Sequence, residues 1–422
     1  PNRSSLISEI DKRFNQLDAQ GKSFAALSLD IDNFRNINST LGHKIGDKLL
    51  ISTAKRFRQF SLQNETLARV EADKFVVLIP GNSITGILDR ANQFLETSRK
   101  PHEIDGSSLT ITASAGLVWA SGGKGDSRTL LQNAEIAMFQ SKKMGRNRAT
   151  IFDQTMRDNL ERQSSLSHAL RLEVANVKGL SLVFQPQFSL EDQTLIGAEV
   201  LLRWHHPEFG NVSPNEFIPV AENSGLIRTL DRLVFTMATK QLAEWMKLGF
   251  ESRLSINISV QSLIVEGAAD QLLSIFEGKA IPSHLIAIEV TESESLAGSA
   301  EALENIEKFR AAGIDIELDD FGTGHSSMTY LQRLPVTGLK IDQSFVKNID
   351  NGDGRSEPIL LATINLAKKM DLKLTAEGVE SESQLNWLRL QKCDVAQGYL
   401  LGKPVDKEQF FSRHCVFQMP TL

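Results

Sequence analysis

The stretch IDIELDDFGTG, at residues 314–324, determines how the rest of this sequence is interpreted. Apolar and polar residues alternate through Leu318, which predicts a β-strand, and the glycines of the run 322–324 predict its end. Asp319 and Asp320 stand side by side where the strand closes. Two crowded carboxylates repel each other unless a cation or a shared proton lies between them. An isolated Asp-Asp pair can also be an acidic turn in solvent. The residues at the ends of the neighbouring strands distinguish a cation site from such a turn.

Seven more strand-like runs lie in the same half of the chain, and helical patterns fill most of the gaps between them. The other strands are expected at Ser181–Gln187, Leu195–Trp204, Arg253–Ser259, Leu285–Thr291, Gly338–Ile341, Leu372–Glu377 and Val395–Leu400. Helices are expected at Leu230–Lys247, Ala300–Ala312, Pro358–Met370 and Glu382–Gln391. Strands alternating with helices over ~250 residues predict a (β/α)8 TIM-like barrel. The first two strands are joined by too few residues for a parallel crossover, so the first should run antiparallel to the second.

Polar and acidic residues lie in or directly after these strands, where a barrel builds its site. The candidates are Glu199, Asn257, Glu289, Asp319, Asp320, Lys340, Glu377 and Gln397. Taken singly, each has an ordinary structural explanation: a salt-bridge partner, a turn former or a surface cation. Together, five acids and an amide at one rim predict bound cations, because buried like charges are costly without them. Oxygen ligands favour Mg²⁺ or Mn²⁺ over Zn²⁺.

These residues lie in motifs that resemble the EAL family of cyclic di-GMP phosphodiesterases. The matching stretches are Gln185-Pro186-Gln187, Glu199-Val200-Leu201-Leu202-Arg203-Trp204, Ile256-Asn257-Ile258-Ser259, Glu289-Val290-Thr291-Glu292, Asp319-Asp320-Phe321-Gly322-Thr323-Gly324, Lys340-Ile341-Asp342, Glu377-Gly378-Val379-Glu380 and Gln397-Gly398-Tyr399. The family tag reads Glu199-Val200-Leu201 here instead of Glu-Ala-Leu. Some family members with Val at this place bind cyclic di-GMP without cutting it.

The resemblance implies a role for each residue in a two-metal hydrolysis that yields linear pGpG. It implies that one metal is held by Glu199, Asn257, Glu289 and Asp319, and the second by Asp319, Asp320 and Glu377. Lys340 would orient the attacking water, and Gln185, Arg203 and Gln397 would bind the substrate. Glu292 would anchor the loop Phe321–Tyr330, which the resemblance links to a homodimer interface. The alternative is a receptor that binds cyclic di-GMP without catalysis, for which a complete metal set would serve no purpose.

The first half predicts a separate α+β layer. Strands are expected at Ser23–Asp30 and Leu109–Trp119, with a hairpin at Leu67–Pro80. Helices are expected at Gly46–Phe60, Ile84–Lys100 and Ser127–Met144. Residues 1–152 carry a net charge of +6 and residues 153–422 a net charge of −12. A basic first half suits an anionic ligand, and an acidic second half suits bound metal ions, although surface charge alone can give the same sums.

The first half resembles a GGDEF (diguanylate cyclase) domain, with one important departure. Asp30-Ile31-Asp32-Asn33-Phe34 resembles the first metal-binding segment of that family. The resemblance assigns guanine reading to Asn38 and Asp47, and phosphate binding to Lys142 and Arg146. The signature hairpin, however, reads Glu71-Ala72-Asp73-Lys74-Phe75 instead of Gly-Gly-Asp-Glu-Phe.

Glycines let a backbone approach phosphates closely, whereas Glu71 adds bulk and negative charge. Lys74 replaces an acid with a cation, and the Arg-x-x-Asp product-inhibition motif is absent near Leu62. We therefore expect no cyclase activity. The domain can then serve as a GTP-sensing regulator, a dimerisation element or a spacer. Asn38 and Asp47 can equally be capping or turn residues.

The length and composition of the chain indicate its class and its division into domains. The chain has 422 residues, 41% of them hydrophobic, and two cysteines that give neither a disulfide framework nor a metal spacing. We expect domains at 1–152 and 170–422, joined by a helical linker at 153–169. The chain starts without Met, so it is expected to be a fragment whose membrane or sensory segments, if any, lie upstream. A cytoplasmic protein without a DNA or RNA polymer as partner is expected.

Overall fold

A computed structural model describes residues 3–415 apart from 123–124, 277, 293–295, 297, 323–330 and 352–355. The chain divides into two compact units, Pro1–Ser164 and Ser165–Leu422. The division falls within helix α6 (Gln154–Asn176), which covers the predicted linker and extends beyond it. Among the described residues, no helix is both long and apolar enough to cross a membrane.

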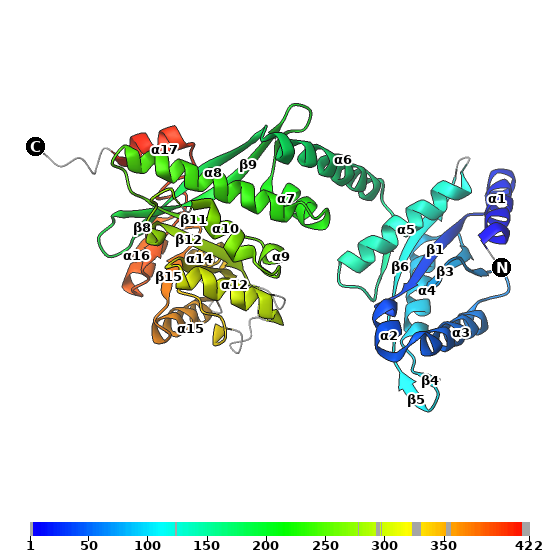
Figure 1. The fold of residues 1–422 in the computed structure, drawn as a ribbon. Helices are drawn as coiled ribbons and strands as arrows, with labels where there is room; N and C mark the ends of the chain where they lie inside the picture. Colours follow the sequence, from blue (N-terminus) through cyan, green and yellow to red (C-terminus); the bar gives the residue numbers. More distant parts are fainter. Residues whose placement is uncertain are drawn as a thin grey trace, which may run out of the picture. The chain divides into compact units, whose positions relative to one another are not determined.

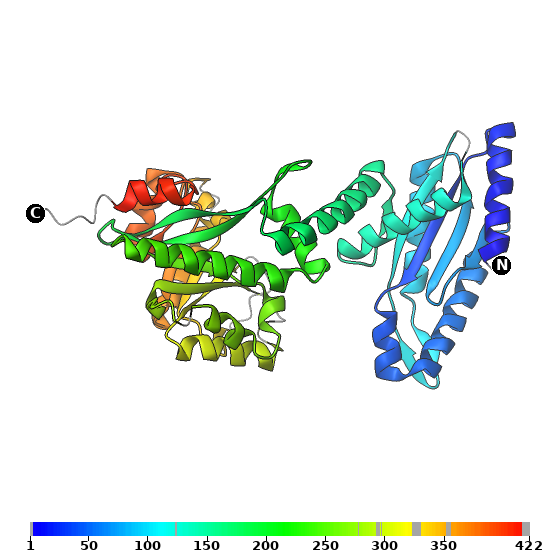
Figure 2. The same ribbon diagram turned by 45° about the horizontal axis from the view of Figure 1, so that its top comes forward.

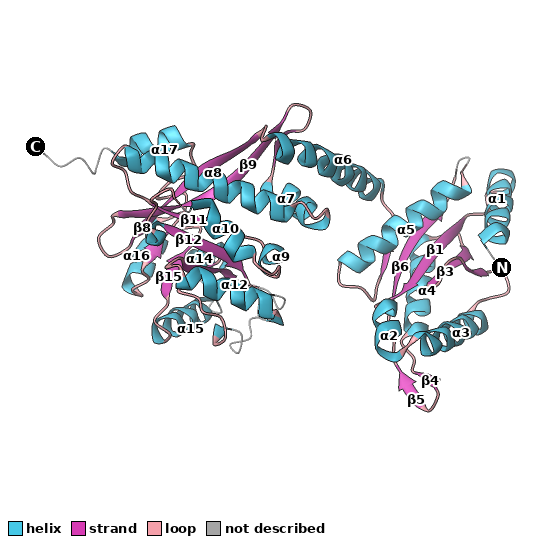
Figure 3. Ribbon diagram, in the orientation of Figure 1, coloured by secondary structure: helices cyan, strands magenta, loops and turns pink. Residues whose placement is uncertain are grey.

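The first unit is a five-stranded sheet covered by helices on both faces (Figures 1 and 3). The strands lie in the order β2-β3-β1-β6-β7, and β4 and β5 form a separate hairpin. The strands are β1 (Phe24–Ile31), β2 (Thr66–Arg69), β3 (Lys74–Pro80), β4 (His102–Ile104), β5 (Ser107–Leu109), β6 (Ala113–Ala120) and β7 (Ala149–Ile151). The helices are α1 (Arg3–Gln20), α2 (Phe34–Leu41), α3 (His43–Phe60), α4 (Ile84–Ser98) and α5 (Ser127–Lys143).

Strand β1 explains the layered form of this unit. All eight of its residues are buried, so both of its faces need a cover. Leu27 packs among residues of α3 and α4, whereas Ala26 packs among residues of α1 and α5. On the α5 side, a Cβ atom at Gly116 would lie 2.0 Å from the carbonyl oxygen of Ala134. Only glycine allows α5 to approach the sheet this closely.

The second unit is a closed barrel surrounded by helices (Figure 2). Its strands are β8 (Leu180–Ser189), β9 (Leu195–His206), β10 (Gly210–Val212), β11 (Arg253–Asn257), β12 (Ile286–Thr291), β13 (Asp315–Phe321), β14 (Gly338–Ile341), β15 (Lys373–Ala376) and β16 (Val395–Ala396). The helices are α7 (Pro214–Asn223), α8 (Ile227–Lys247), α9 (Val260–Leu263), α10 (Ala268–Phe276), the 3-10 turn η1 (Ser283–Leu285), α12 (Ala300–Ala311), α14 (Gln343–Asn351), α15 (Ser356–Lys369), α16 (Glu382–Leu390) and α17 (Lys407–His414).

The barrel closes as the sequence predicts. The strand order is β10-β9-β11-β12-β13-β14-β15-β16-β8, and β8 pairs with β9 to complete the ring. The pairs from β9–β11 to β15–β16 are parallel, whereas β8 is antiparallel to both of its neighbours. The prediction of an antiparallel first strand is therefore confirmed.

Two predicted strands are shorter than expected. The run Leu109–Trp119 divides into β5 and β6, and the run Val395–Leu400 is a strand only through Ala396. Beyond Ala396 the chain turns against the segment that follows β15. A Cβ atom at Gly398 would lie 2.2 Å from the backbone nitrogen and oxygen of Val379, so this close approach of two loops requires glycine. The helices α1 and α2 and the β4–β5 hairpin were not anticipated from the sequence.

Candidate active site

The register of the barrel strands brings the predicted site residues to one rim. Glu199 on β9 pairs with Ser255 and, across the antiparallel ladder, with Gln185 of β8. Asn257, the last residue of β11, pairs with Glu289 of β12. Asp319 of β13 pairs with Thr291, the last residue of β12. Glu377 directly follows β15, and Gln397 directly follows β16. The carboxyl ends of the parallel strands therefore gather the acids predicted from the sequence.

The ammonium group of Lys340 lies at the centre of this cluster. Its Nζ atom is 2.7 Å from Glu289 Oε2 and 2.6 Å from Glu377 Oε1. It is also 3.2 Å from Asp319 Oδ1 and 3.8 Å from Glu199 Oε1. Lys340 and Glu289 are completely buried. A buried ammonium is stable here because four carboxylates surround it.

A chain of amides holds one wall of the cluster. Asn257 Nδ2 donates a hydrogen bond of 3.0 Å to Glu199 Oε1, and Gln397 donates to the other oxygen of the same carboxylate. Gln397 also donates to Gln185 Oε1 at 3.2 Å and accepts from Gln187 Nε2 at 3.0 Å. Gln187 belongs to the Gln185-Pro186-Gln187 motif but is not among the site residues predicted from the sequence. These bonds fix the Glu199 carboxylate toward Lys340.

A bulge in β13 determines how the two aspartates are presented. The pairing of β13 with β14 shifts register between Leu318 and Phe321. Within this segment Asp320 adopts a left-handed conformation, with φ of 56°, and its N–H donates to Asp319 Oδ1 at 3.0 Å. In a regular strand adjacent side chains point to opposite faces, and a bulge redirects one of them. Periodicity alone did not predict this feature.

The acids of the cluster have raised pKa values. Burial raises the pKa of Glu377 to about 8, although Lys340 opposes the change. Burial also raises the pKa of Glu289 well above its usual value, and burial together with the charge of Asp319 raises that of Asp320. Asp342, two residues after Lys340, adds to the effect on Asp320. Asp342 is thus a further acid near the site; its position in the quoted Lys340-Ile341-Asp342 motif was the available signal.

The donor set fits divalent cations. When all five predicted carboxylates are ionised, they and the ammonium of Lys340 carry a net charge of −4, which two divalent cations would neutralise. Glu289 Oε1 is buried without a hydrogen-bond partner in the described part of the protein. Carboxylate and amide oxygens are the preferred ligands of Mg²⁺ and Mn²⁺. The described residues contain no group of three or more acidic, His or Cys side chains arranged around a ready metal position. Instead, Lys340 is the internal counter-ion.

Arg203 lies beside the cluster, on the same strand face as Glu199. Burial lowers the pKa of its guanidinium, while the charge of Glu199 opposes the change. Arg203 and Asn257 both line a cavity of about 230 Å³ that extends beneath α7 and α8. Val200 is buried and lines the same cavity, where it adds only apolar volume.

A buried acid that the sequence did not reveal supports the end of β11. Asp231 of α8 accepts hydrogen bonds from the backbone N–H of Ser259 at 3.0 Å and from Ser262 Oγ at 2.6 Å. The hydroxyl of Ser259 donates to Glu222 of α7 at 3.1 Å. Ser259 follows Asn257 by two residues, so these bonds position the loop that begins at the cluster. The sequence signal was weak, because Asp231 falls within an ordinary helical pattern.

Replacing Asp231 by Asn should remove part of the pH dependence of stability. Burial raises the pKa of Asp231 to about 7. The native chain therefore holds this proton more tightly than the unfolded chain, and the resulting stabilisation is complete below about pH 4 and lost as the pH rises through about 7. From pH 5 to pH 8, the free energy of unfolding of the parent protein should fall by about 2 to 3 kcal/mol relative to that of Asp231→Asn.

Urea unfolding at the two pH values measures this difference. Asp270→Asn, at an exposed acid on α10, is the matched control and should keep the pH dependence of the parent protein. Equal pH dependence in the parent protein and in Asp231→Asn would contradict the prediction.

In the first unit, ion pairs involve Lys142, one of the predicted nucleotide residues, and Lys74 of the altered hairpin. Lys142 pairs with Asp30, and Lys74 lies 3.1 Å from Glu71 and 3.7 Å from Glu135. Burial raises the pKa of Asp30, and the interaction with Lys142 opposes this rise. Lys142 therefore supplies a positive charge to Asp30 of the predicted metal-binding segment, and Lys74 places a second cation in the altered hairpin.

The two predicted guanine-reading residues differ in their surroundings. Asn38 Oδ1 is buried without a partner among the described residues, against Gly46, whereas Asp47 is exposed. Arg146 is also exposed, with a φ of 61°. Among these predicted nucleotide-binding residues, Asn38 therefore has a buried side-chain oxygen that could accept a hydrogen bond from a ligand.

Only the start of the predicted dimer loop lies in the described structure. The backbone N–H of Gly322 donates to Glu292 Oε2 at 3.4 Å, which ties Glu292 to the residues following the two aspartates. Residues 323–330 of the predicted loop, including His325, lie outside the described residues.

Known proteins resemble both units. The EAL domain family matches residues 163–404, and the family described as diguanylate cyclase, GGDEF domain, matches residues 1–148. The bifunctional diguanylate cyclase/cyclic di-GMP phosphodiesterase MucR of Pseudomonas aeruginosa is 34% identical over 414 residues, which are 98% of this chain and 60% of MucR. The cyclic di-GMP phosphodiesterase NbdA of the same organism is 32% identical over 405 residues, covering 96% of this chain and 52% of NbdA.

A solved structure also resembles the second unit. The PaMucR phosphodiesterase in complex with c-di-GMP aligns with a TM-score of 0.55 and 35% identity, covering 58% of this chain and 99% of that chain. The chain spans about half to 60% of the length of the two curated relatives.

Proposed function

Because the chain belongs to the EAL family and carries a GGDEF domain ahead of it, we propose that its barrel hydrolyses cyclic di-GMP to linear pGpG. The observation that carries the proposal is the buried cluster of acids around Lys340. A protein that only binds an anionic dinucleotide gains nothing from an excess of negative charge at its binding site. An enzyme that holds divalent cations requires it.

Glu199, Asn257, Glu289 and Asp319 would hold one cation, and Asp319, Asp320 and Glu377 the other. When bound, Mg²⁺ or Mn²⁺ ions would activate water and offset negative charge on the phosphate. In the reaction, a water oxygen bonds to phosphorus, the bond from phosphorus to the 3′-oxygen breaks, and that oxygen takes up a proton. We assign Lys340 to hold the water, because its ammonium lies at the centre of the acids that would hold the cations.

The substrate would be gripped by the polar groups at the edge of the cluster. The guanidinium of Arg203 suits a phosphate, because its fork donates two parallel hydrogen bonds. Gln185 and Gln397 already bond to each other, and their amide groups can turn to a guanine edge or a sugar. Glu292, which ties to Gly322, would link occupancy of the site to the following loop and to a homodimer.

The first unit is proposed as a module without cyclase activity that regulates the barrel. Its support is the altered hairpin, where Glu71 stands at a glycine position of the signature and pairs with Lys74, so a side chain lies where glycine would let a phosphate approach. GTP sensing is the specific role that we propose, through Asn38, Asp47, Lys142 and Arg146. MucR is described as bifunctional, so both activities have to be measured.

Incubation of the protein with cyclic di-GMP and Mg²⁺ or Mn²⁺ tests the main proposal. Chromatography should show pGpG, and chelation with EDTA should abolish its formation. Tight binding of cyclic di-GMP with no pGpG under either metal would instead support a receptor.

A Val200→Ala variant, which restores the usual family tag, should change the rate of pGpG formation by less than about threefold, because this side chain adds only a small apolar volume.

Incubation with GTP and Mg²⁺ tests the first unit. We expect no cyclic di-GMP from GTP, and we expect GTP to change the rate of pGpG formation. Asn38→Ala should abolish the GTP effect without changing the basal rate. Accumulation of cyclic di-GMP would contradict the assignment of an inactive cyclase domain, and an unchanged rate with GTP would contradict GTP sensing.

A further inference from the structure

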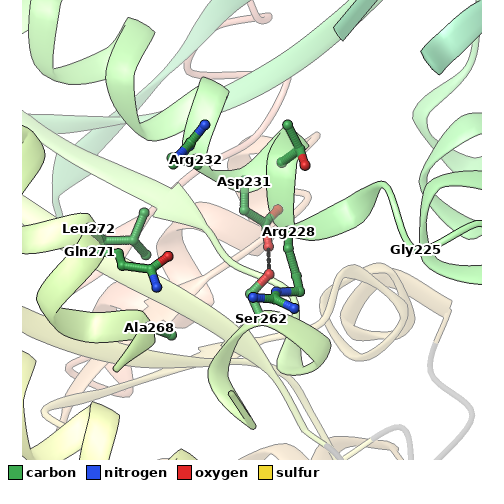
Figure 4. A pocket seen from close by; sticks show the side chains of 9 residues that line it. Gly225, Arg228, Asp231, Arg232, Ser262, Ala268, Gln271 and Leu272 are labelled. Carbon is green, nitrogen blue, oxygen red and sulfur yellow. Dashed lines mark hydrogen bonds between the residues drawn. The ribbon is translucent and has the colours of Figure 1, made fainter. Parts of the chain in front are cut away.

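A second polar pocket lies on the outside of the barrel, between α8 and α10 (Figure 4). Its volume is about 350 Å³, within the range of roughly 300–1,000 Å³ typical of small-ligand sites. The polar groups that line it are Arg228, Thr229, Asp231 and Arg232 of α8, Ser262 of α9 and Gln271 of α10. None of these residues belongs to the cluster around Lys340.

Two arginines give the pocket positive charge. Arg228 and Arg232 are exposed and one helical turn apart. Within the described parts of the chain, neither guanidinium forms an ion pair or a hydrogen bond with another side chain. Figure 4 shows the two side chains apart, with Asp231 drawn between them. An anion that contacts both guanidinium groups would relieve the repulsion of two like charges.

The acid that lines the pocket is already engaged. The carboxylate of Asp231 accepts from Ser262 and from the backbone of Ser259, as Figure 4 shows for the first of these bonds. Burial, the main cause, raises the pKa of Asp231 to about 7, so near neutral pH it contributes less than a full negative charge. The two arginines therefore dominate the electrostatics of the pocket.

We infer that this α8–α10 pocket binds a small phosphate monoester. Two guanidinium groups match the two charges of a monoester dianion better than the single charge of a carboxylate or a phosphodiester. Thr229 and Gln271 add donors for the remaining phosphate oxygens. Ala268 and Leu272 are the apolar side chains among the described lining residues, so the pocket offers little apolar surface to a large hydrophobic ligand.

The pocket is joined to the cluster through Asp231. The same carboxylate that lines the pocket bonds to Ser259, and Ser259 lies two residues beyond Asn257. Asn257 in turn donates to Glu199. Occupancy of the pocket would therefore shift the position of the β11 end and change the affinity of the barrel for cyclic di-GMP. This second part of the inference rests on the proposed function.

Titration calorimetry on the full chain, with EDTA present, tests the binding site. Without divalent cations the acidic cluster repels phosphate, so binding at the barrel site does not interfere. Lys142 and Arg146 of the first unit are unchanged in every variant used here, so any binding of a probe to them is the same in all the proteins compared. Inorganic phosphate, pyrophosphate and GMP are the probes, and at least one should bind with a saturable isotherm. The double variant Arg228→Gln, Arg232→Gln should weaken binding by about tenfold or more, because it removes both charge-assisted donors.

The matched control is Lys240→Gln together with Lys247→Gln, two exposed cations of α8 that do not line the pocket. This control should bind as the parent protein does. Absence of saturable binding for all three probes, or equal binding by the arginine variant, would overturn the site. These outcomes do not depend on whether the barrel hydrolyses cyclic di-GMP.

The link is tested by the dissociation constant for cyclic di-GMP, measured with and without a saturating amount of the bound probe. The constant should change by about fivefold or more in the parent protein, which is the lower end of ordinary couplings. It should not change in the arginine variant. An equal change in both proteins would show competition at the barrel site, and no change in either would overturn the link while the binding site stands.

Discussion

An Asp320→Asn variant should bind cyclic di-GMP much as the parent protein does but hydrolyse it at least about 100-fold more slowly. Asp320 lies in the bulge of β13, where burial and, in addition, the charges of Asp319 and Asp342 raise the pKa of its carboxyl group. The amide keeps the shape of the side chain but removes the charge that would hold the second cation. Initial rates of pGpG formation with Mn²⁺, and calorimetric titration of cyclic di-GMP, measure the two effects.

The same variant should be at least as stable as the parent protein in EDTA. Burial and the charge of Asp319 raise the pKa of Asp320, so its ionised form is strained in the metal-free protein. A merely misfolded variant would instead lose stability. Glu304→Gln, at an exposed acid of α12 that pairs with Lys308, is the matched control and should keep the parent rate. Turnover of Asp320→Asn at the parent rate would refute the two-metal assignment.

A Lys340→Met variant should lose about 3 to 5 kcal/mol of unfolding free energy in EDTA, because removing one partner of a buried ion pair leaves the others uncompensated. Here four carboxylates would lose their common counter-ion. Methionine retains most of the volume of the lysine side chain, so the loss of unfolding free energy measures the removal of the charge more than a change in packing. Urea unfolding at pH 8 measures the change.

Two further measurements identify the cause of that loss. The loss should be smaller at pH 5, since the acids of the cluster have raised pKa values and can take up protons as the pH falls. Mn²⁺ should stabilise Lys340→Met more than it stabilises the parent protein, because cations would then supply the missing charge. Lys308→Met removes an exposed pair and should cost less than about 1 kcal/mol. Equal stability of Lys340→Met and the parent protein in EDTA would contradict the counter-ion role.

Local sequence signals were sufficient for most of the barrel. The alternation before Asp319 and the short connection after Gln187 gave the strands and the antiparallel start of the ring. The acids at strand ends also identified the rim, since parallel strands that share a sheet bring their carboxyl ends together. Helix α1 was missed because its buried residues, such as Leu6 and Phe14, complete a sheet face that the local pattern does not reveal.

What the sequence determined by itself was which residue types stand at which strand ends, because periodicity and connection length are local properties of the chain. What only the tertiary structure decided was how those residues meet. The bulge that turns Asp320, the placement of the Lys340 ammonium among four carboxylates and the bonds from Asp231 to the β11 end all depend on strand register and helix packing. Such contacts join residues far apart in the chain, and no local pattern encodes their distances or charges.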